Sequence, residues 1–306
     1  MATTHKCYHT PQSMAYIQNV ARHSALILPE NNEPVYLPLI FHSVGSLSPD
    51  GKEIVEKRIR EVTSEIQKDF SDYSSDGNLT RYKNIISKVF IDHPEKQKTY
   101  LGSDHVDRIP VSSQDIHVRL ANIYHYPEES PLDLGSEAMQ YDDVHRKIKT
   151  HLQTNGAKAV QPDRAVNIWV IGMPQVAHLG MSDFPWEEID DFHGIVIDQS
   201  VLFPPADSPF DSYRVLTHQL GHYLGLVHVS TRQFTQERLA TEKENMEEIL
   251  RADDYNPLFS NFMDHTRDSC VSHFTRAQFA KMKSIIIRFR PGLMSTEKLV
   301  LPTNVF

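Results

Sequence analysis

The sequence predicts an α/β (α+β) fold, in which a mixed, twisted sheet is backed by helices and followed by a smaller helical lobe. The hydrophobic pattern runs strand, helix, strand, helix, three strands and helix, an order typical of a mixed sheet covered by helices. The strand pattern stops near Gly225. With 306 residues, 40% of them hydrophobic, the chain is long enough to bury a core in one large domain or two lobes.

Short apolar or alternating runs predict the strands. Residues 35–44 are expected to form the first core strand, and residues 165–173, the most apolar run, a central one. Residues 180–186 are short and contain Pro185, which suits an edge position because proline lacks a backbone donor. The two remaining predicted strands are residues 116–126 and 194–202.

Apolar residues at helical spacing predict the helices. The clearest case is residues 53–70, in which one stripe consists of Ile54, Val55, Ile59, Val62 and Ile66. Thr275 is a candidate N-cap for the last long helix, because its hydroxyl can accept from the first turn. The other predicted helices are residues 13–24, 136–152, 213–224, 231–251 and 274–288.

The composition argues against two classes of partner. Asp and Glu number 40 against 31 Lys and Arg, the formal net charge is −9 and no basic run is present, whereas nucleic-acid binding needs a basic face. The longest apolar runs, such as residues 168–173, fall well short of the ~18 residues of a membrane span. The N-terminus shows no apolar signal segment, so either the chain is not exported by that route or a signal has been removed.

Three histidines form the most informative pattern in the chain. His218 and His222 are four residues apart, so a helix places both imidazoles on one face, one turn apart. Gly225 can end that helix by adopting a positive φ, and the turn would bring His228 to a third corner. Three neutral nitrogen ligands with an open fourth position are typical of a catalytic Zn²⁺ site. Accidental spacing is the alternative, and the hinge glycine argues against it.

The stretch 218–228 resembles the HExxHxxGxxH pattern of metzincin metalloproteases, and Met263 within residues 261–264 resembles their Met-turn. Further matches resemble the pappalysin family of that clan, at residues 167–170, 179–180, 184–185, 194–197 and 274–282. The resemblance implies a metzincin-like, secreted zinc endopeptidase. It also implies a pro-segment-like extension over residues 1–30 and a catalytic domain over 31–306, with an upper part to residue 225 and a lower part from 226.

Gln219 departs from this pattern, because active relatives carry a glutamate at that position. The glutamate takes a proton from the attacking water and passes it to the leaving amine. An amide has the same shape but cannot take the proton. The sequence therefore predicts an intact fold and metal site with little or no hydrolysis. It leaves open whether the glutamine is natural or introduced.

His265 stands where active relatives have a tyrosine, two residues after Met263. A tyrosine there can stabilise the oxyanion, and a histidine can still donate a hydrogen bond. His265 is thus a candidate oxyanion stabiliser. The alternative is a solvated histidine in a turn.

Substrate recognition follows from the resemblance as well. Asp268 matches an aspartate at the base of the S1′ pocket, which implies cleavage on the N-terminal side of Arg or Lys. A peptide substrate would bind as an added strand along Leu179 and Gly180. The alternative for Asp268 is a surface carboxylate, and the neighbouring Arg267 could neutralise it.

Two further features concern latency and calcium. Cys7 resembles a pro-segment cysteine whose thiolate occupies the open zinc position, although Tyr8 replaces the usual glycine. A cysteine in an unstructured tail is the equal alternative. Relatives carry a cysteine-bridged calcium segment between His228 and residue 261, whereas this chain has no cysteine there. Ca²⁺ binding by residues 253–256 is therefore weakly supported beside a simple turn.

Two hypotheses from different classes remain. The first is a pappalysin-type zinc endopeptidase zymogen in a Glu-to-Gln form. The second is a zinc-binding pseudoprotease that holds peptides or protein partners without cleaving them. Both predict the same fold and bound zinc, and they differ in whether a glutamate at position 219 restores cleavage.

Overall fold

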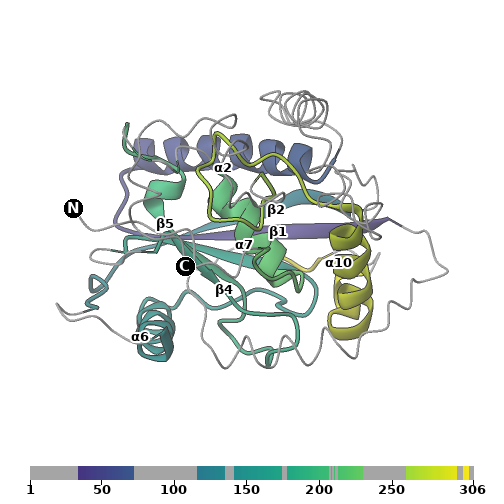
Figure 1. Cartoon of the computed structure of the whole chain (residues 1–306). Coiled ribbons are helices and arrows are strands. Elements are labelled where there is room, and N and C mark those ends of the chain that lie inside the picture. Colours follow the sequence, from purple (N-terminus) through teal and green to yellow (C-terminus); the bar gives the residue numbers. More distant parts are fainter. Residues whose placement is uncertain are drawn as a thin grey trace.

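The computed structural model describes residues 34–71, 116–134, 141–173, 178–206, 208, 210, 213–229, 260–294 and 299–302. The predicted helices over residues 13–24 and 231–251, Cys7, and the calcium candidates at residues 253–256 lie outside these ranges. Figure 1 shows the strands and helices of the described part. In chain order they are β1 Val35–Val44, α2 Pro49–Asp69, β2 Ile116–Tyr126, α6 Tyr141–Thr154, β3 Val166–Ile171, β4 Gly180–Ser182, β5 Ile195–Asp198, η1 Gln199–Val201, α7 Arg214–Tyr223, α10 Arg276–Phe289 and η2 Pro291–Met294.

The strands form one mixed five-stranded sheet in the order β2-β1-β3-β5-β4. All neighbouring pairs are parallel except β4 and β5, which are antiparallel. The fully buried β3 lies in the centre and the short β4 lies at one edge. The predicted mixed sheet and its central strand are therefore confirmed. The predicted edge strand is also confirmed, but it ends at Ser182 rather than at residue 186.

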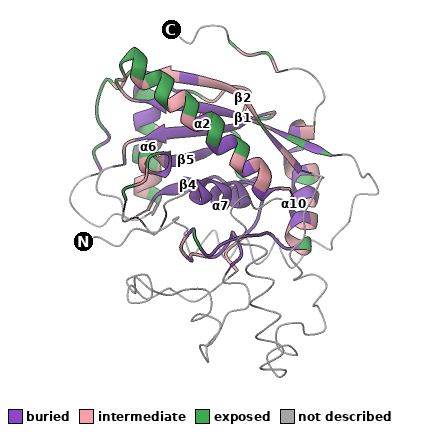
Figure 2. Ribbon diagram, turned by 90° about the horizontal axis from the view of Figure 1, so that it is seen from above, coloured by how far each residue is buried: buried purple, intermediate pink, exposed green. Residues whose placement is uncertain are grey.

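Helices cover both faces of the sheet. On one face, α2, α7 and α10 pack against the odd-numbered residues of β1, from Val35 to Phe41, in one hydrophobic core. On the other face, α6 packs against Trp169 and Ile171 of β3 in a second core. Figure 2 shows α7 buried along its whole length, whereas α2 exposes one side. The helix that carries two of the candidate ligands is thus enclosed by the fold.

Two predicted details are corrected by the structure. Ile54 does not belong to the buried stripe of α2, since 58% of it is exposed, whereas Ile59, Val62 and Ile66 are buried. The strand predicted over residues 194–202 ends at Asp198. The Asp198 side chain accepts hydrogen bonds from Ser200 N at 2.8 Å and Met173 N at 2.7 Å, and the chain turns into η1. Strand β5 ends here, although apolar residues follow, because the Asp198 carboxylate caps η1.

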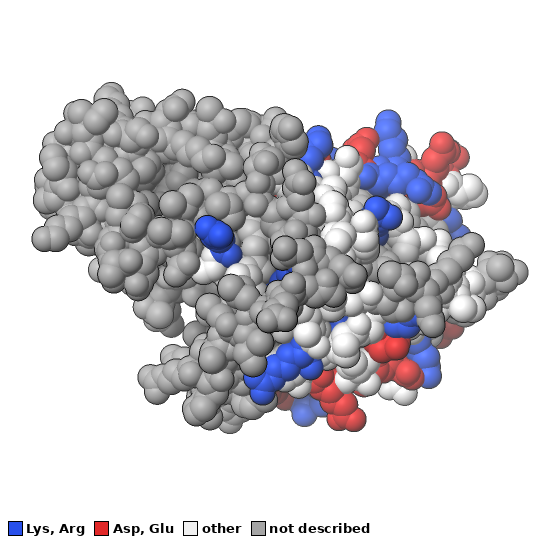
Figure 3. All heavy atoms as spheres, turned by 90° about the vertical axis from the view of Figure 1, so that its right-hand side faces the viewer, with Lys and Arg blue, Asp and Glu red and all other residues white. Residues whose placement is uncertain are grey.

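The predicted cap of the last helix is confirmed. The Thr275 hydroxyl accepts from Gln278 N, and Gln278 Oε1 accepts from Thr275 N at 2.7 Å, forming a capping box. Among the described residues, no helix is long and apolar enough to cross a membrane. On the face seen in Figure 3, acidic and basic side chains of the described residues are interspersed.

Candidate metal centre

Helix α7 presents His218 and His222 on one face. The helix is buried throughout, and both histidines are fully buried. Their ring centroids lie 4.6 Å apart, as expected for side chains one helical turn apart. The sequence folds as a helix here because apolar residues such as Val215, Leu216 and Leu220 face the sheet and the core.

Gly225 ends the helix and turns the chain back. Its φ is +86°, and a β-carbon there would lie 2.9 Å from Ile285 Cγ2, so any other residue would meet both backbone strain and a close contact. Leu226 N donates to Gly221 O at 2.8 Å and Gly225 N donates to His222 O at 2.8 Å, which closes the turn. His228 is thereby carried back over the helix.

The Nε2 atoms of these three histidines converge. Their separations are 3.0 Å between His218 and His222, 3.1 Å between His222 and His228, and 3.2 Å between His218 and His228. Nitrogen ligands at two corners of a tetrahedral zinc site lie about 3.3 Å apart, given Zn–N bonds of about 2.0–2.1 Å. The donor set therefore fits Zn²⁺ in both chemistry and spacing. We call these residues the histidine triad.

The outer nitrogens of the triad are also placed. His218 Nδ1 lies 2.7 Å from Phe262 O, and His222 Nδ1 lies 2.9 Å from Leu226 O. A carbonyl can only accept, so each Nδ1 carries the proton and each Nε2 keeps its lone pair for a metal. This arrangement fixes the tautomer that a metal ligand requires.

Met263 lies under the triad helix. It is fully buried, and a β-carbon at Gly221 would collide with its sulfur. Its backbone N donates to Asn261 Oδ1 at 2.9 Å, while Asn261 Nδ2 donates to Gln278 Oε1 at 2.8 Å. The turn that contains Met263 is therefore tied to the capped N-terminus of α10.

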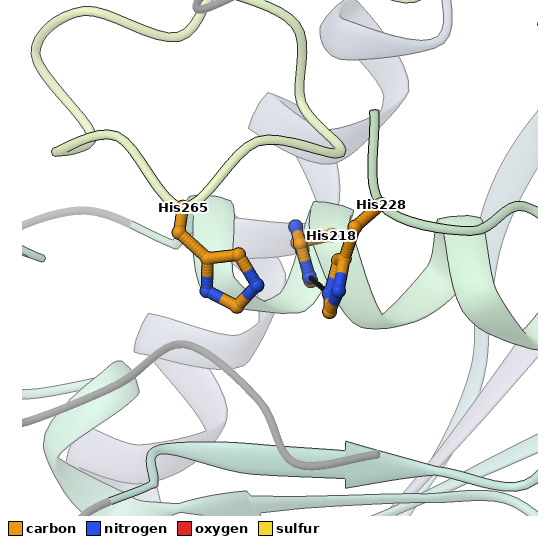
Figure 4. A group of neighbouring side chains, drawn as sticks. All are labelled: His218, His228 and His265. Carbon is orange, nitrogen blue, oxygen red and sulfur yellow. Dashed lines mark hydrogen bonds between the residues drawn. The ribbon is translucent and has the colours of Figure 1, made fainter. Parts of the chain in front are cut away.

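His265 approaches the triad from the segment after Met263 (Figure 4). Its ring centroid lies 4.1 Å from that of His228 and 5.5 Å from that of His218. One ligand nitrogen from each of these three histidines lies within 4.8 Å of the other two. The sequence indicated that His265 lies near the metal site, and the structure brings its imidazole beside His218 and His228.

Gln219 lies next to the edge strand. It is fully buried, and a β-carbon placed on Gly180 would lie 3.1 Å from Gln219 Cγ and 3.3 Å from Nε2. The side-chain amide thus points towards β4, the strand along which the sequence predicts that a peptide substrate would bind. Leu179, which precedes that strand, is buried and its carbonyl accepts from Asp198 N at 2.9 Å.

Asp268 is buried, with 1% of its surface exposed. Its backbone carbonyl accepts from Arg214 Nη1 at 3.1 Å. The same guanidinium lies 3.6 Å from the Asp69 carboxylate. The sequence suggested Arg267 as the cation near Asp268, and the structure adds Arg214, which is buried beside the Asp268 backbone.

Sequence reasoning missed two buried carboxylates that hold the site. Asp69, at the end of α2, accepts from Thr217 Oγ1 of α7 at 2.7 Å. Asp183, just after β4, accepts from Gly194 N at 2.9 Å and lies 3.0 Å from His145 Nε2. Burial by itself would raise the pKa of Asp183, but the His145 hydrogen bond and the Lys149 charge lower it below its usual value. The sequence signal for both was an acidic residue at the end of a helix or strand, since Asp69 ends α2 and Asp183 follows β4.

Comparison with known proteins gives distant sequence relatives and a similar fold. No protein-family model matches the chain. The chain is 32% identical to the uncharacterized protein R722 of Acanthamoeba polyphaga mimivirus, over 95% of this chain and 37% of that protein. It is 23% identical to an extracellular metalloprotease of Arthroderma benhamiae, over 42% of this chain and 49% of that protein. The chain thus spans less than half the length of these relatives.

Among solved structures, mirolysin in complex with compound 9 is similar to the chain, with a TM-score of 0.56 and 19% identity. The similarity covers 86% of this chain and 96% of mirolysin. At this identity the likeness shows the fold alone. The chain therefore has a fold similar to that of mirolysin, and the histidine triad lies within this fold.

Proposed function

We propose that this chain is a pappalysin-type zinc endopeptidase scaffold that binds Zn²⁺ and extended peptides but, with Gln219, hydrolyses them poorly or not at all. One observation supports the proposal most strongly. The three Nε2 atoms of the triad converge at 3.0–3.2 Å, and the side-chain amide of Gln219, the residue after His218, faces the edge strand β4.

Zinc held by the triad would supply Lewis-acid polarisation of a peptide carbonyl. The chain's own residues do the rest. The edge strand β4 would align an extended peptide by backbone hydrogen bonds, beside the triad. Gln219 can donate a hydrogen bond or accept one, but its amide cannot take up a proton at neutral pH. Loss of general acid–base help lowers a rate by about 10²–10⁴-fold.

The proposal extends to specificity through Asp268. A buried carboxylate at the base of a primed-side pocket favours Arg or Lys as the residue after the scissile bond. The burial of Asp268 supports this assignment. Arg214, next to the Asp268 backbone, works against it because a second cation would be repelled.

The wider organisation remains part of the proposal. Residues 1–30 would act as a pro-segment, with Cys7 as a ligand that keeps the site latent, and the catalytic domain would divide near residue 225. Secretion follows only from the resemblance to extracellular metalloproteases such as that of Arthroderma benhamiae.

A pseudoprotease is the second candidate function. Two residues favour it together, because both Gln219 and His265 depart from the catalytic pattern at the same site. Such a protein would retain zinc and peptide binding and lack cleavage even with a glutamate at position 219.

The test is the rate of peptide cleavage by Gln219→Glu protein beside the unchanged chain, with zinc content measured in both. Peptides would carry a single Arg or Lys, and one set of proteins would have residues 1–30 removed. Gln153→Glu is the matched control. Gln153 is exposed on α6, and α6 covers the face of the sheet opposite to α7. Cleavage before Arg or Lys by the Gln219→Glu form alone supports the endopeptidase scaffold. Zinc binding without cleavage in any form favours the pseudoprotease.

A further inference from the structure

We infer that His265 is a fourth metal ligand, which closes the coordination position that the histidine triad leaves open. This inference rests on the zinc site proposed above and assigns a different role to His265 from oxyanion stabilisation. With His265 bound, the metal would have four nitrogen ligands instead of three. An incoming group would have to displace His265 before it could bind the metal.

The geometry brings the His265 imidazole beside His218 and His228, two members of the histidine triad. The triad nitrogens are 3.0–3.2 Å apart, and His265 offers a nitrogen within 4.8 Å of those of His218 and His228. Figure 4 shows the His265 ring directed at the space beside the other two rings. A tetrahedral set of nitrogen ligands requires separations of about 3.3 Å, so we infer that the His265 ring moves closer to the triad when the metal binds.

The backbone on either side of His265 is fixed, so the imidazole stays near the triad. Asp264 N donates to Asn261 O at 3.0 Å, and Asp264 Oδ1 accepts from Thr266 N at 2.9 Å. Both neighbours of His265 are buried, whereas His265 itself is half-buried. Its ring is thus held beside the triad by a hydrogen-bonded turn.

Chemistry favours a ligand at this position. Neutral imidazole is a good zinc ligand through a ring nitrogen. Tetrahedral sites with four protein ligands are closed and serve structure or regulation, whereas catalytic sites keep one position open. With Gln219 unable to act as a base, a fourth histidine is consistent with a site that stores or gates the metal. A peptide carbonyl would have to displace His265 to reach it.

The test combines metal affinity with the visible spectrum of the Co²⁺ form, using the full chain. The variants are His265→Ala and His265→Phe, the second of which keeps a ring but lacks nitrogen. His117→Ala is the matched control, because His117 lies on β2, the edge strand opposite to β4 in the sheet. Circular dichroism of each metal-free protein checks that the variants fold. Azide is the probe for an open coordination position.

We expect both His265 variants to lose about tenfold or more in Zn²⁺ affinity by chelator competition, while His117→Ala matches the unchanged chain. The Co²⁺ absorption bands should shift in the His265 variants, and azide should bind them at least tenfold more tightly. Equal zinc affinity, equal spectra and equal azide binding in all four proteins would overturn the inference while leaving the triad intact. If the unchanged chain binds neither metal, the proposed zinc site itself fails, and this inference fails with it.

Discussion

Gln219 differs from the expected glutamate by one atom, because an amide nitrogen replaces a carboxylate oxygen. Glutamine and glutamate have nearly the same shape, so a glutamate at position 219 would lie in the same place beside Gly180 of β4. Only the carboxylate can accept a proton at neutral pH. Its neighbours His218 and His222 hold their metal-binding tautomer through carbonyl groups that do not depend on Gln219.

Gly225 provides a residue-scale prediction. A Gly225→Ala variant must adopt a φ of +86° and meet Ile285 Cγ2 at 2.9 Å. We expect a loss of about 1–2 kcal/mol in the free energy of unfolding, together with weaker zinc binding because His228 is displaced. Urea unfolding and chelator competition measure the two effects.

The control for this variant is Gly45→Ala, where a β-carbon would meet no atom within 4 Å. That change should leave both quantities almost unchanged. A Gly225→Ala protein as stable and as tightly zinc-bound as Gly45→Ala would show that the positive φ does not place His228.

At the scale of elements, hydrophobic periodicity predicted the strands, and polar contacts shortened one of them. Strand β1 has the predicted ends, because its alternating residues face two separate cores. Strand β5 ends early because Asp198 caps η1. The mutual position of the elements could not be predicted, since Asp69 joins α2 to α7 across 148 residues of sequence through Thr217.

The capping box of α10 gives the element-scale prediction. Thr275→Ala removes the hydroxyl that accepts from Gln278 N and loosens the hydrogen bonds between Gln278 and Asn261. We expect a loss of about 1 kcal/mol in the free energy of unfolding and faster zinc release, because Asn261 holds the turn of Met263. Thermal unfolding and zinc release to a chelator measure these effects.

Thr150→Ala is the matched control, since Thr150 is exposed on α6 and donates only along its own helix. If the two threonine variants release zinc at the same rate, the capped helix does not support the metal centre.

At the scale of the whole molecule, buried histidines link stability to pH. His42 is fully buried, with Nε2 2.8 Å from Asn167 Oδ1 and Nδ1 3.1 Å from the Tyr126 hydroxyl. Burial lowers the pKa of His42 to about 4, although the Asn167 hydrogen bond raises it in part. The unfolded chain therefore binds a proton near pH 6.5 that the folded chain does not bind until about pH 4.

Stability should fall as pH drops from 6.5 to about 4, and His42 should account for about 3 kcal/mol of the loss. A His42→Gln variant is expected to be less stable at pH 7 but to show a shallower decline, by close to one proton, in urea unfolding across that range. His117→Gln is the control for loss of a histidine elsewhere. An unchanged slope in His42→Gln would contradict the assignment.

The sequence alone predicted the mixed sheet, its central and edge strands, and the three histidines with their hinge glycine. These features depend on local spacing, which a single chain displays. The position of His265 two residues after Met263 already indicated that it lies near the site. Its ring contact with His228, and the burial of Arg214 beside Asp268, depend on how the segment after residue 260 folds over α7. These contacts join segments far apart in the chain, so local spacing did not predict them.

The most direct test of the account is the zinc content of the purified chain after equilibrium dialysis, beside His222→Ala and the control His117→Ala. We expect one zinc ion per chain in the unchanged protein and in His117→Ala. In His222→Ala, zinc should be nearly absent and the unfolding temperature should no longer rise with added zinc. Equal zinc content in His222→Ala and the unchanged chain, or no zinc in either, would contradict the claim that the histidine triad is a metal site.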